Sequence, residues 1–140
     1  MANPANTTAY RLPDGRMAVN VTEAKTLAAA DSGYVQNVTY ASGAVTLPAT
    51  AVHGTFIIRN GGVAEGGTAG SGDDGNLITV TPNAADKVEG GVSGTATDGK
   101  PFENTAATAR VGDEITVVNS ALTAGGMASG VKGVWVRNNT

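Results

Sequence analysis

The stretch Gly54-Thr55-Phe56-Ile57-Ile58-Arg59 decides the class of fold. Its β-branched and aromatic residues favour a strand, and its apolar run is dense enough to be buried on both faces. On its N-terminal side, Val45-Thr46-Leu47 predicts a second strand that ends at Pro48, because proline cannot donate to a ladder. On its C-terminal side, residues 61–75 are rich in glycine and predict a flexible loop. A buried strand between turn-rich segments is typical of an all-β protein.

Short apolar runs separated by turn residues continue along the chain and predict about eight strands. These lie at residues 34–40, 45–47, 55–59, 77–81, 87–89, 106–111, 114–118 and 131–136. With 140 residues in one domain, the physical solutions are two packed antiparallel sheets or a closed barrel. No internal repeat stands out, which disfavours a solenoid. The one helix-favouring stretch, residues 22–30, fits one or two helical turns or a strand end equally well.

The first 22 residues differ from the rest. Residues 10–12 and 17–21 read as short strands, with the turn sequence Pro13-Asp14-Gly15 between them. We therefore predict an extended N-terminal arm over residues 1–22 and a single β domain over residues 23–140.

Composition excludes several classes of function. The net charge of −3 lacks the basic footprint of a nucleic-acid binder, and no apolar run is long enough to span a membrane. The absence of cysteine excludes disulfides, iron–sulfur clusters and thiolate zinc sites. The single histidine, His53, excludes a site that needs two imidazoles. The N-terminus has neither the basic nor the apolar segment of a secretory signal.

Two glycine-rich strings imitate phosphate-binding motifs. Residues 70–75 match G-x-G-x-x-G, but the string leads into a strand instead of a helix and carries two carboxylates. Residues 94–101 are one residue short of a P-loop, and a hairpin turn on Asp98-Gly99 explains them better. Asp73-Asp74 supplies too few oxygen ligands to predict a calcium site, although weak cation binding stays open. The sequence thus predicts no catalytic residue, no cofactor and no metal.

The chain has few large aromatic side chains, and each could have one of two roles. Trp135, Tyr10, Tyr34 and Tyr40 either pack inside the sheets or serve as interface anchors, where tryptophan and tyrosine are enriched. The core is thin, so we expect a partner or self-association to add stability. The candidate interface residues are Tyr10, Arg11, Leu12, Met17, Val19, Val21, Tyr34 and Trp135.

The order of several strings points to a known family. They are residues 27–33, 45–49, 54–58, 78–87, 112–118 and 133–136. Over roughly residues 25–137 the chain resembles the small jelly-roll capsid cement, or head decoration, proteins of tailed bacteriophages, particularly those of podoviruses. The long segment of residues 61–75 departs from that pattern.

The resemblance implies a non-enzymatic jelly roll that is made in the bacterial cytoplasm and binds the outer surface of the virion capsid. There it would bridge neighbouring major capsid proteins, with a homodimer favoured over a trimer. Residues 2–21 would grip by adding to exposed sheet edges. The alternative is a glycan- or receptor-binding β-sandwich of a phage tail or fibre, which would stack sugars on Trp135 and the tyrosines.

Overall fold

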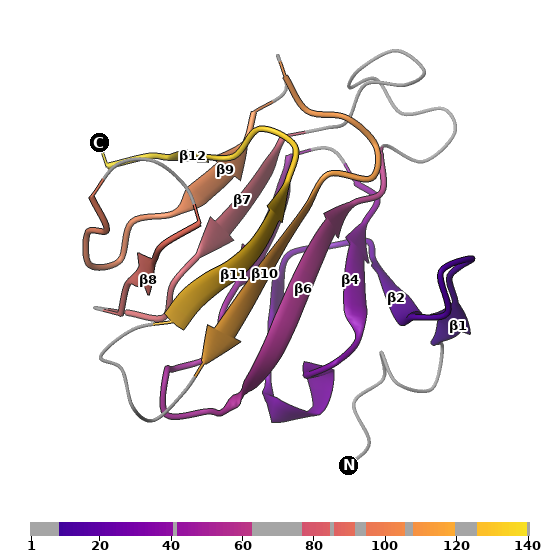
Figure 1. The fold of residues 1–140 in the computed structure, drawn as a ribbon, viewed down its shortest axis with the longest axis horizontal. Helices are drawn as coiled ribbons and strands as arrows, with labels where there is room; N and C mark the ends of the chain where they lie inside the picture. Colours follow the sequence, from indigo (N-terminus) through magenta and orange to yellow (C-terminus); the bar gives the residue numbers. More distant parts are fainter. Residues whose placement is uncertain are drawn as a thin grey trace.

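The computed structural model describes residues 9–40, 42–62, 77–84, 86–91, 95–105, 108–119 and 126–139. Over these ranges the chain is almost entirely β (Figure 1). The strands are β1 (Tyr10–Arg11), β2 (Met17–Val21), β3 (Lys25–Thr26), β4 (Val35–Val38), β5 (Gly43–Thr46), β6 (Gly54–Asn60), β7 (Ile78–Thr81), β8 (Val88–Glu89), β9 (Phe102–Asn104), β10 (Glu114–Asn119), β11 (Gly126–Lys132) and β12 (Val136–Arg137). One 3₁₀ turn, η1, covers Ala29–Asp31.

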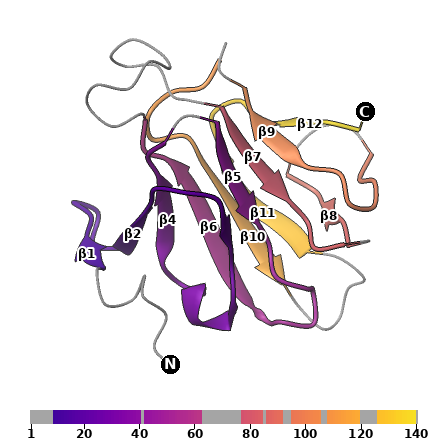
Figure 2. The ribbon, with the colours of Figure 1, turned by 180° about the vertical axis from the view of Figure 1, so that it is seen from behind.

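The strands form two sheets that pack face to face. One sheet has the order β1-β2-β4-β6-β10-β11-β8, and the other has the order β12-β9-β7-β5-β3. The seven-stranded sheet faces the viewer in Figure 1, and the five-stranded sheet faces the viewer in Figure 2. The predicted all-β class is confirmed, as a two-layered arrangement of mixed sheets.

The N-terminal half of the chain forms a coil that passes back and forth from one sheet to the other. From β2 to β7, successive strands alternate between the seven-stranded and the five-stranded sheet. Neighbours within each sheet are therefore parallel: β2 with β4, β4 with β6, β3 with β5, and β5 with β7. Each link leads into the other layer, so the chain re-enters a sheet in its original direction instead of turning back through a hairpin.

This coil corrects the prediction of antiparallel sheets. Among the described strands, antiparallel pairing is limited to β1 with β2 and to the C-terminal half, where β10 lies between β6 and β11 and β9 lies between β7 and β12. Even there, the short β8 pairs with β11 in parallel. The sequence shows no repeat because the turns of the coil differ in length and content, so the solenoid-like path leaves no period to detect.

Alternating side chains of both sheets fill the space between them. Phe56, Ile58, Ile115 and Val117 point inward from β6 and β10, and all four are fully buried. Residues of the facing sheet complete this cluster, among them Val45, Ile78, Val80 and Phe102. β6 and β10 place every second side chain in the core, so each strand has one outward face. The prediction that the run at 54–59 is buried on both faces was therefore wrong, because Thr55, Ile57 and Arg59 face outward and are only partly buried.

The structure changes the predicted N-terminal boundary. β2 lies between β1 and β4 in the seven-stranded sheet, and its Val19 and Val21 are 0% and 2% exposed. Residues 17–21 are therefore part of the domain and not of an arm. Residues 1–8 of the predicted arm lie outside the described residues.

Other boundaries also move. Residues 22–30 supply β3 and the start of η1. The predicted strand at 131–136 is interrupted, because β11 ends at Lys132 and Gly133 takes a φ of +88° before β12 begins. Of the predicted strand at 106–111, residues 106–107 lie outside the described residues, and residues 108–111 belong to none of the strands. The amide of Ala109 instead donates to the carbonyl of Thr105. Most of the predicted loop at 61–75, including Asp73-Asp74, lies outside the described residues.

Candidate binding surface

The outer face of the seven-stranded sheet carries its side chains in ordered rows. Strand register places Asn20, Asn37, Arg59, Glu114 and Lys132 in one row, which we call the polar row. The next row along the strands is Ala18, Val35, Ile57, Thr116 and Gly130, which carries no charge. Of these two rows, only the polar row carries charge.

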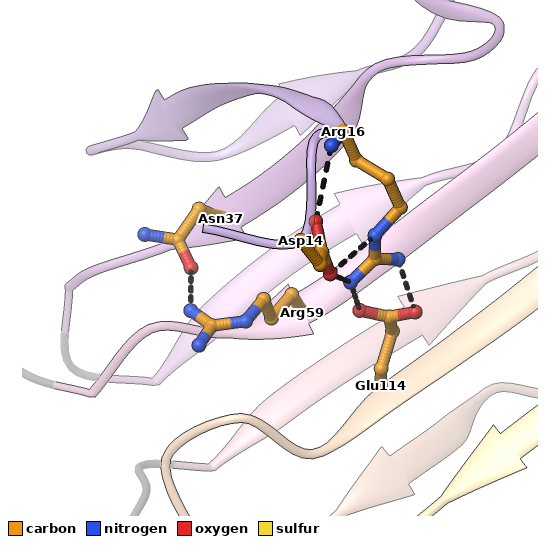
Figure 3. A network of polar contacts seen from close by, with 5 residues as sticks. All are labelled: Asp14, Arg16, Asn37, Arg59 and Glu114. Carbon is orange, nitrogen blue, oxygen red and sulfur yellow. Dashed lines mark hydrogen bonds and ion pairs between the residues drawn. The ribbon is translucent and has the colours of Figure 1, made fainter. Parts of the chain in front are cut away.

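A clasp joins the β1–β2 turn to β10 within the polar row (Figure 3). Arg16 donates from Nη1 to Oε1 of Glu114 at 2.6 Å and from Nη2 to Oε2 at 2.9 Å. Its Nε donates to Oδ2 of Asp14 at 2.9 Å, and its backbone amide donates to Oδ1 of the same carboxylate at 3.0 Å. Because β4 and β6 lie between β2 and β10 in the sheet, the ion pair of Arg16 with Glu114 joins segments that are not neighbours in the strand order. The clasp fixes the turn against the sheet.

Charge in the clasp shifts two pKa values. Hydrogen bonds from Arg16 lower the pKa of Asp14, and the more distant charge of Arg59 lowers it further. The carboxylates of Glu114 and Asp14 raise the pKa of Arg16. Both effects favour the ionised forms of Asp14 and Arg16.

A second group of polar contacts attaches β1 to the same row. Arg59 donates from Nη1 to Oδ1 of Asn37 at 2.8 Å, and Nδ2 of Asn37 donates to the hydroxyl of Tyr10 at 3.2 Å. The Tyr10 hydroxyl in turn donates to Oδ1 of Asn20 at 2.6 Å. With the clasp, these bonds hold the hairpin of β1 and β2 at both ends.

The structure separates the candidate interface residues into three groups. Tyr10 and Arg11 are exposed on β1, at the edge of the seven-stranded sheet. Leu12, Met17 and Tyr34 are half-buried. Val19, Val21 and Trp135 are buried and offer no surface to a partner, which corrects their inclusion in the predicted interface.

Trp135 packs in the core, which is the first of the two roles considered for it. It is 4% exposed, belongs to the core cluster, and donates from Nε1 to the carbonyl of Lys132 at 3.0 Å. Its ring is therefore not available to stack on a sugar at the surface.

Of the two motif-like strings, residues 70–75 lie outside the described residues, and the second string is described from residue 95 onward. Asp98-Gly99 lies in a turn in which the Gly99 amide donates to the carbonyl of Asp86 and the Lys100 amide to that of Thr97. His53 is exposed. Among the described residues, no three histidine, aspartate or glutamate side chains gather as a metal site, and no helix is long and apolar enough to cross a membrane.

Sequence reasoning missed the polar groups that organise the molecule. Arg16, Glu114 and Asn37 were not singled out, because nothing in the sequence places the β1–β2 turn near β10. Asn60 and Asn104 had a usable signal, since each follows a core residue at strand spacing: Ile58 before Asn60, and Phe102 before Asn104. The alternation alone puts both amides in the interior.

Comparison with known proteins gives no relative. No protein-family model matches the chain, and neither a curated protein nor a solved structure matches it.

Proposed function

We propose that this chain is a structural, non-enzymatic virion protein that binds the outer surface of a tailed-phage capsid and bridges neighbouring major capsid proteins. It is made in the cytoplasm of the bacterial host and acts as a homo-oligomer, with a dimer favoured over a trimer. Bridging stabilises the assembled shell by mass action, because the chain binds the shell and not its separated subunits.

The observation that carries the proposal is a preorganised edge strand. β1 is the last strand of the seven-stranded sheet, and both of its residues are exposed. Leu12 donates its amide to the carbonyl of Arg16, so ladder alternation directs the amide and carbonyl of Arg11 away from β2. A strand of a capsid protein can pair with such an edge through main-chain bonds. The clasp already holds this edge in place, which lowers the entropy lost on binding.

The family resemblance supports the same function at a coarser level. Its strings at 45–49, 54–58, 78–87 and 112–118 overlap the strands β5, β6, β7 and β10, which supply much of the core. They are therefore scaffold residues. The proposal keeps the β-sandwich scaffold of the jelly-roll cement proteins, although the parallel coil of β2 to β7 departs from a jelly roll built of antiparallel strands.

Arg11→Pro tests the edge directly. Proline removes the edge-facing amide and is tolerated on edge strands, so the fold should survive. The assay is co-sedimentation with heads of the phage that encodes the chain, after the heads have been stripped of this protein. We expect the affinity of Arg11→Pro for these heads to fall at least about tenfold, which corresponds to about 1.4 kcal/mol of binding free energy. Arg11→Ala removes the side chain but keeps the backbone amide, so it should retain most of the binding.

The matched control is Thr26→Pro on β3, at the edge of the other sheet. Leu27 donates its amide to Thr46, so the amide of Thr26 also faces away from its sheet. Equal losses in the two proline variants, or wild-type binding by Arg11→Pro, would contradict the role of β1. Failure of the wild-type chain to bind heads at a regular copy number would contradict the proposed function itself. Deleting residues 2–20 would not test the edge alone, because it would also remove most of β2.

A further inference from the structure

Asn60-Gly61 is the only Asn-Gly dipeptide in the chain. Asparagine before glycine is the sequence most prone to deamidation, because glycine has no side chain to hinder its backbone nitrogen. That nitrogen attacks Cγ of the asparagine and closes a succinimide ring. We therefore ask which contacts require asparagine at position 60 and glycine at position 61.

The structure supplies that reason for both residues. Asn60 is fully buried, where its Nδ2 donates to Oδ1 of Asn104 at 2.6 Å and its Oδ1 accepts from the amide of Gly62 at 3.0 Å. Gly61 packs against Asn37, and a Cβ at position 61 would lie 2.7 Å from Oδ1 of Asn37. A carboxylate at position 60 or a side chain at position 61 would disturb these contacts.

The same contacts block the reaction in the closed fold. The amide of Gly61, which is the nucleophile, donates to the carbonyl of Val38 at 2.8 Å. The side-chain amide of Asn60, which is the leaving group, is held by Asn104. The backbone of Asn60 is also fixed, since its amide donates to the carbonyl of Asp113 and its carbonyl accepts from the amide of Gly112. Ring closure requires these bonds to break first.

We propose that Asn60 is a deamidation site that reacts only when the hydrogen bonds around Asn60 and Gly61 open. On opening, the nitrogen of Gly61 bonds to Cγ of Asn60 and loses its proton, and the Cγ–Nδ2 bond breaks to release ammonia. Water then adds to the succinimide and opens it, leaving aspartate or isoaspartate at position 60. The rate in the native chain is set by the population of the open state.

The reaction is directional because its product does not fit the closed site. An aspartate at position 60 directs a carboxylate oxygen at Oδ1 of Asn104, in place of the Nδ2 donor. Asn104 cannot turn its own amide round without losing the bonds from Nδ2 to Oδ2 of Asp113 and to the carbonyl of Val134. Burying an unpaired charge is costly, so each converted molecule opens more readily.

The test follows deamidation of the isolated chain by peptide mapping with fragment-ion mass spectrometry at mildly alkaline pH. We expect conversion at Asn60 to be at least about tenfold slower in the native chain than in urea. Asn104→Ala should accelerate it in the folded chain, whereas Asn139→Ala, at an exposed position, should not. Asn60→Asp, which mimics the product, should melt at a lower temperature than the wild type.

Hydrogen exchange gives a readout that does not depend on any variant. The Gly61 amide should be among the protected amides of the wild-type chain, because it is the blocked nucleophile. Equal deamidation rates with and without urea, fast exchange at Gly61, or an unchanged rate in folded Asn104→Ala would each overturn the proposal. None of these measurements involves a capsid, so their failure leaves the proposed function untouched.

Discussion

Arg16 and Glu114 form a two-bond ion pair, although two strands separate β2 from β10 in the sheet order. Arg16 lies in the turn before β2, and Glu114 opens β10 near the other end of the chain. The pair therefore couples the most N-terminal hairpin to the antiparallel half of the molecule. Arg16 is 37% exposed and Glu114 is 18% exposed, so water weakens the pair, and its main effect is to fix position.

Glu114→Gln should loosen the β1–β2 hairpin with little loss of global stability. It removes the negative charge of Glu114 but keeps the side-chain shape, and we expect a cost of less than about 1 kcal/mol in urea unfolding. Trypsin should cleave after Arg16 faster than in the wild type, because the hairpin opens locally. Glu23→Gln, at an exposed position, is the control. Unchanged cleavage at Arg16 would show that the ion pair does not hold the turn.

Asp14 should titrate below its ordinary pKa of 3.8. The hydrogen bonds from Arg16 stabilise the carboxylate, so the folded pKa lies below the unfolded one. The resulting contribution to stability is present above the unfolded pKa and is lost as the pH falls through the folded pKa. An NMR titration of the Asp14 carboxyl carbon measures this, and Arg16→Gln should return the midpoint towards 3.8. A midpoint that does not respond to Arg16→Gln would contradict the assigned cause.

Lys25→Met should cost more than any change in the clasp. The ammonium of Lys25 lies 3.1 Å from Oδ1 of Asp31, which is 1% exposed, and donates to Oε1 of the buried Gln36. Removing one partner of such a buried pair leaves a charge in the interior, and we expect a loss of about 3 kcal/mol in urea unfolding. Lys132→Met, on the exposed outer face, should cost little. Similar losses in the two variants would mean that Asp31 does not depend on Lys25.

Arg137→Met should open the seam between the two sheets at β8 and β12. Arg137 donates to the carbonyls of Val88 and Gly90 and lies 4.6 Å from the ring centre of Phe102. Burial lowers its pKa, so it holds its charge against a desolvation cost. We expect a loss of about 1–3 kcal/mol and faster amide exchange in β8, with partial rescue by Arg137→Lys. Exchange that rises evenly over the whole chain would argue against a local seam.

Trp135→Ala should destabilise the fold. Truncating this buried ring leaves a cavity, and we expect a loss of roughly 3–5 kcal/mol in urea unfolding. Val136→Ala, on an exposed neighbour, serves as the control. A folded Trp135→Ala variant of normal stability that lost binding to sugars would restore the glycan-reading alternative.

Local patterns predicted most of the strands but not their pairing. Residue type in Thr55–Arg59 and in Glu114–Val118 is a local property, so the strands β6 and β10 could be predicted directly. The single buried face of β6 could not, because its apolar run gave no alternation to follow. Whether β4 pairs with β6 in parallel depends on the path of the chain through the other sheet, which no local pattern records. The antiparallel prediction was wrong for this reason.

The site was harder to predict than the fold. Tyr10 and Arg11 were identified as candidate contacts, and both are exposed at a sheet edge. Trp135 was included on residue type alone, and residue type does not distinguish a core ring from an interface ring. The clasp joins residues 98 positions apart in sequence, so only the three-dimensional path brings its charges together.

The coil also bears on where this molecule tolerates change. Gly43 of β5 pairs with Ile78 of β7, although the chain between β6 and β7 is much longer than the links between earlier strands. Lengthening a link that starts and ends at fixed strands costs little free energy, since loop closure grows only slowly with length. The link between β6 and β7 is accordingly where added length should cost the fold least, since both of its ends are fixed by paired strands.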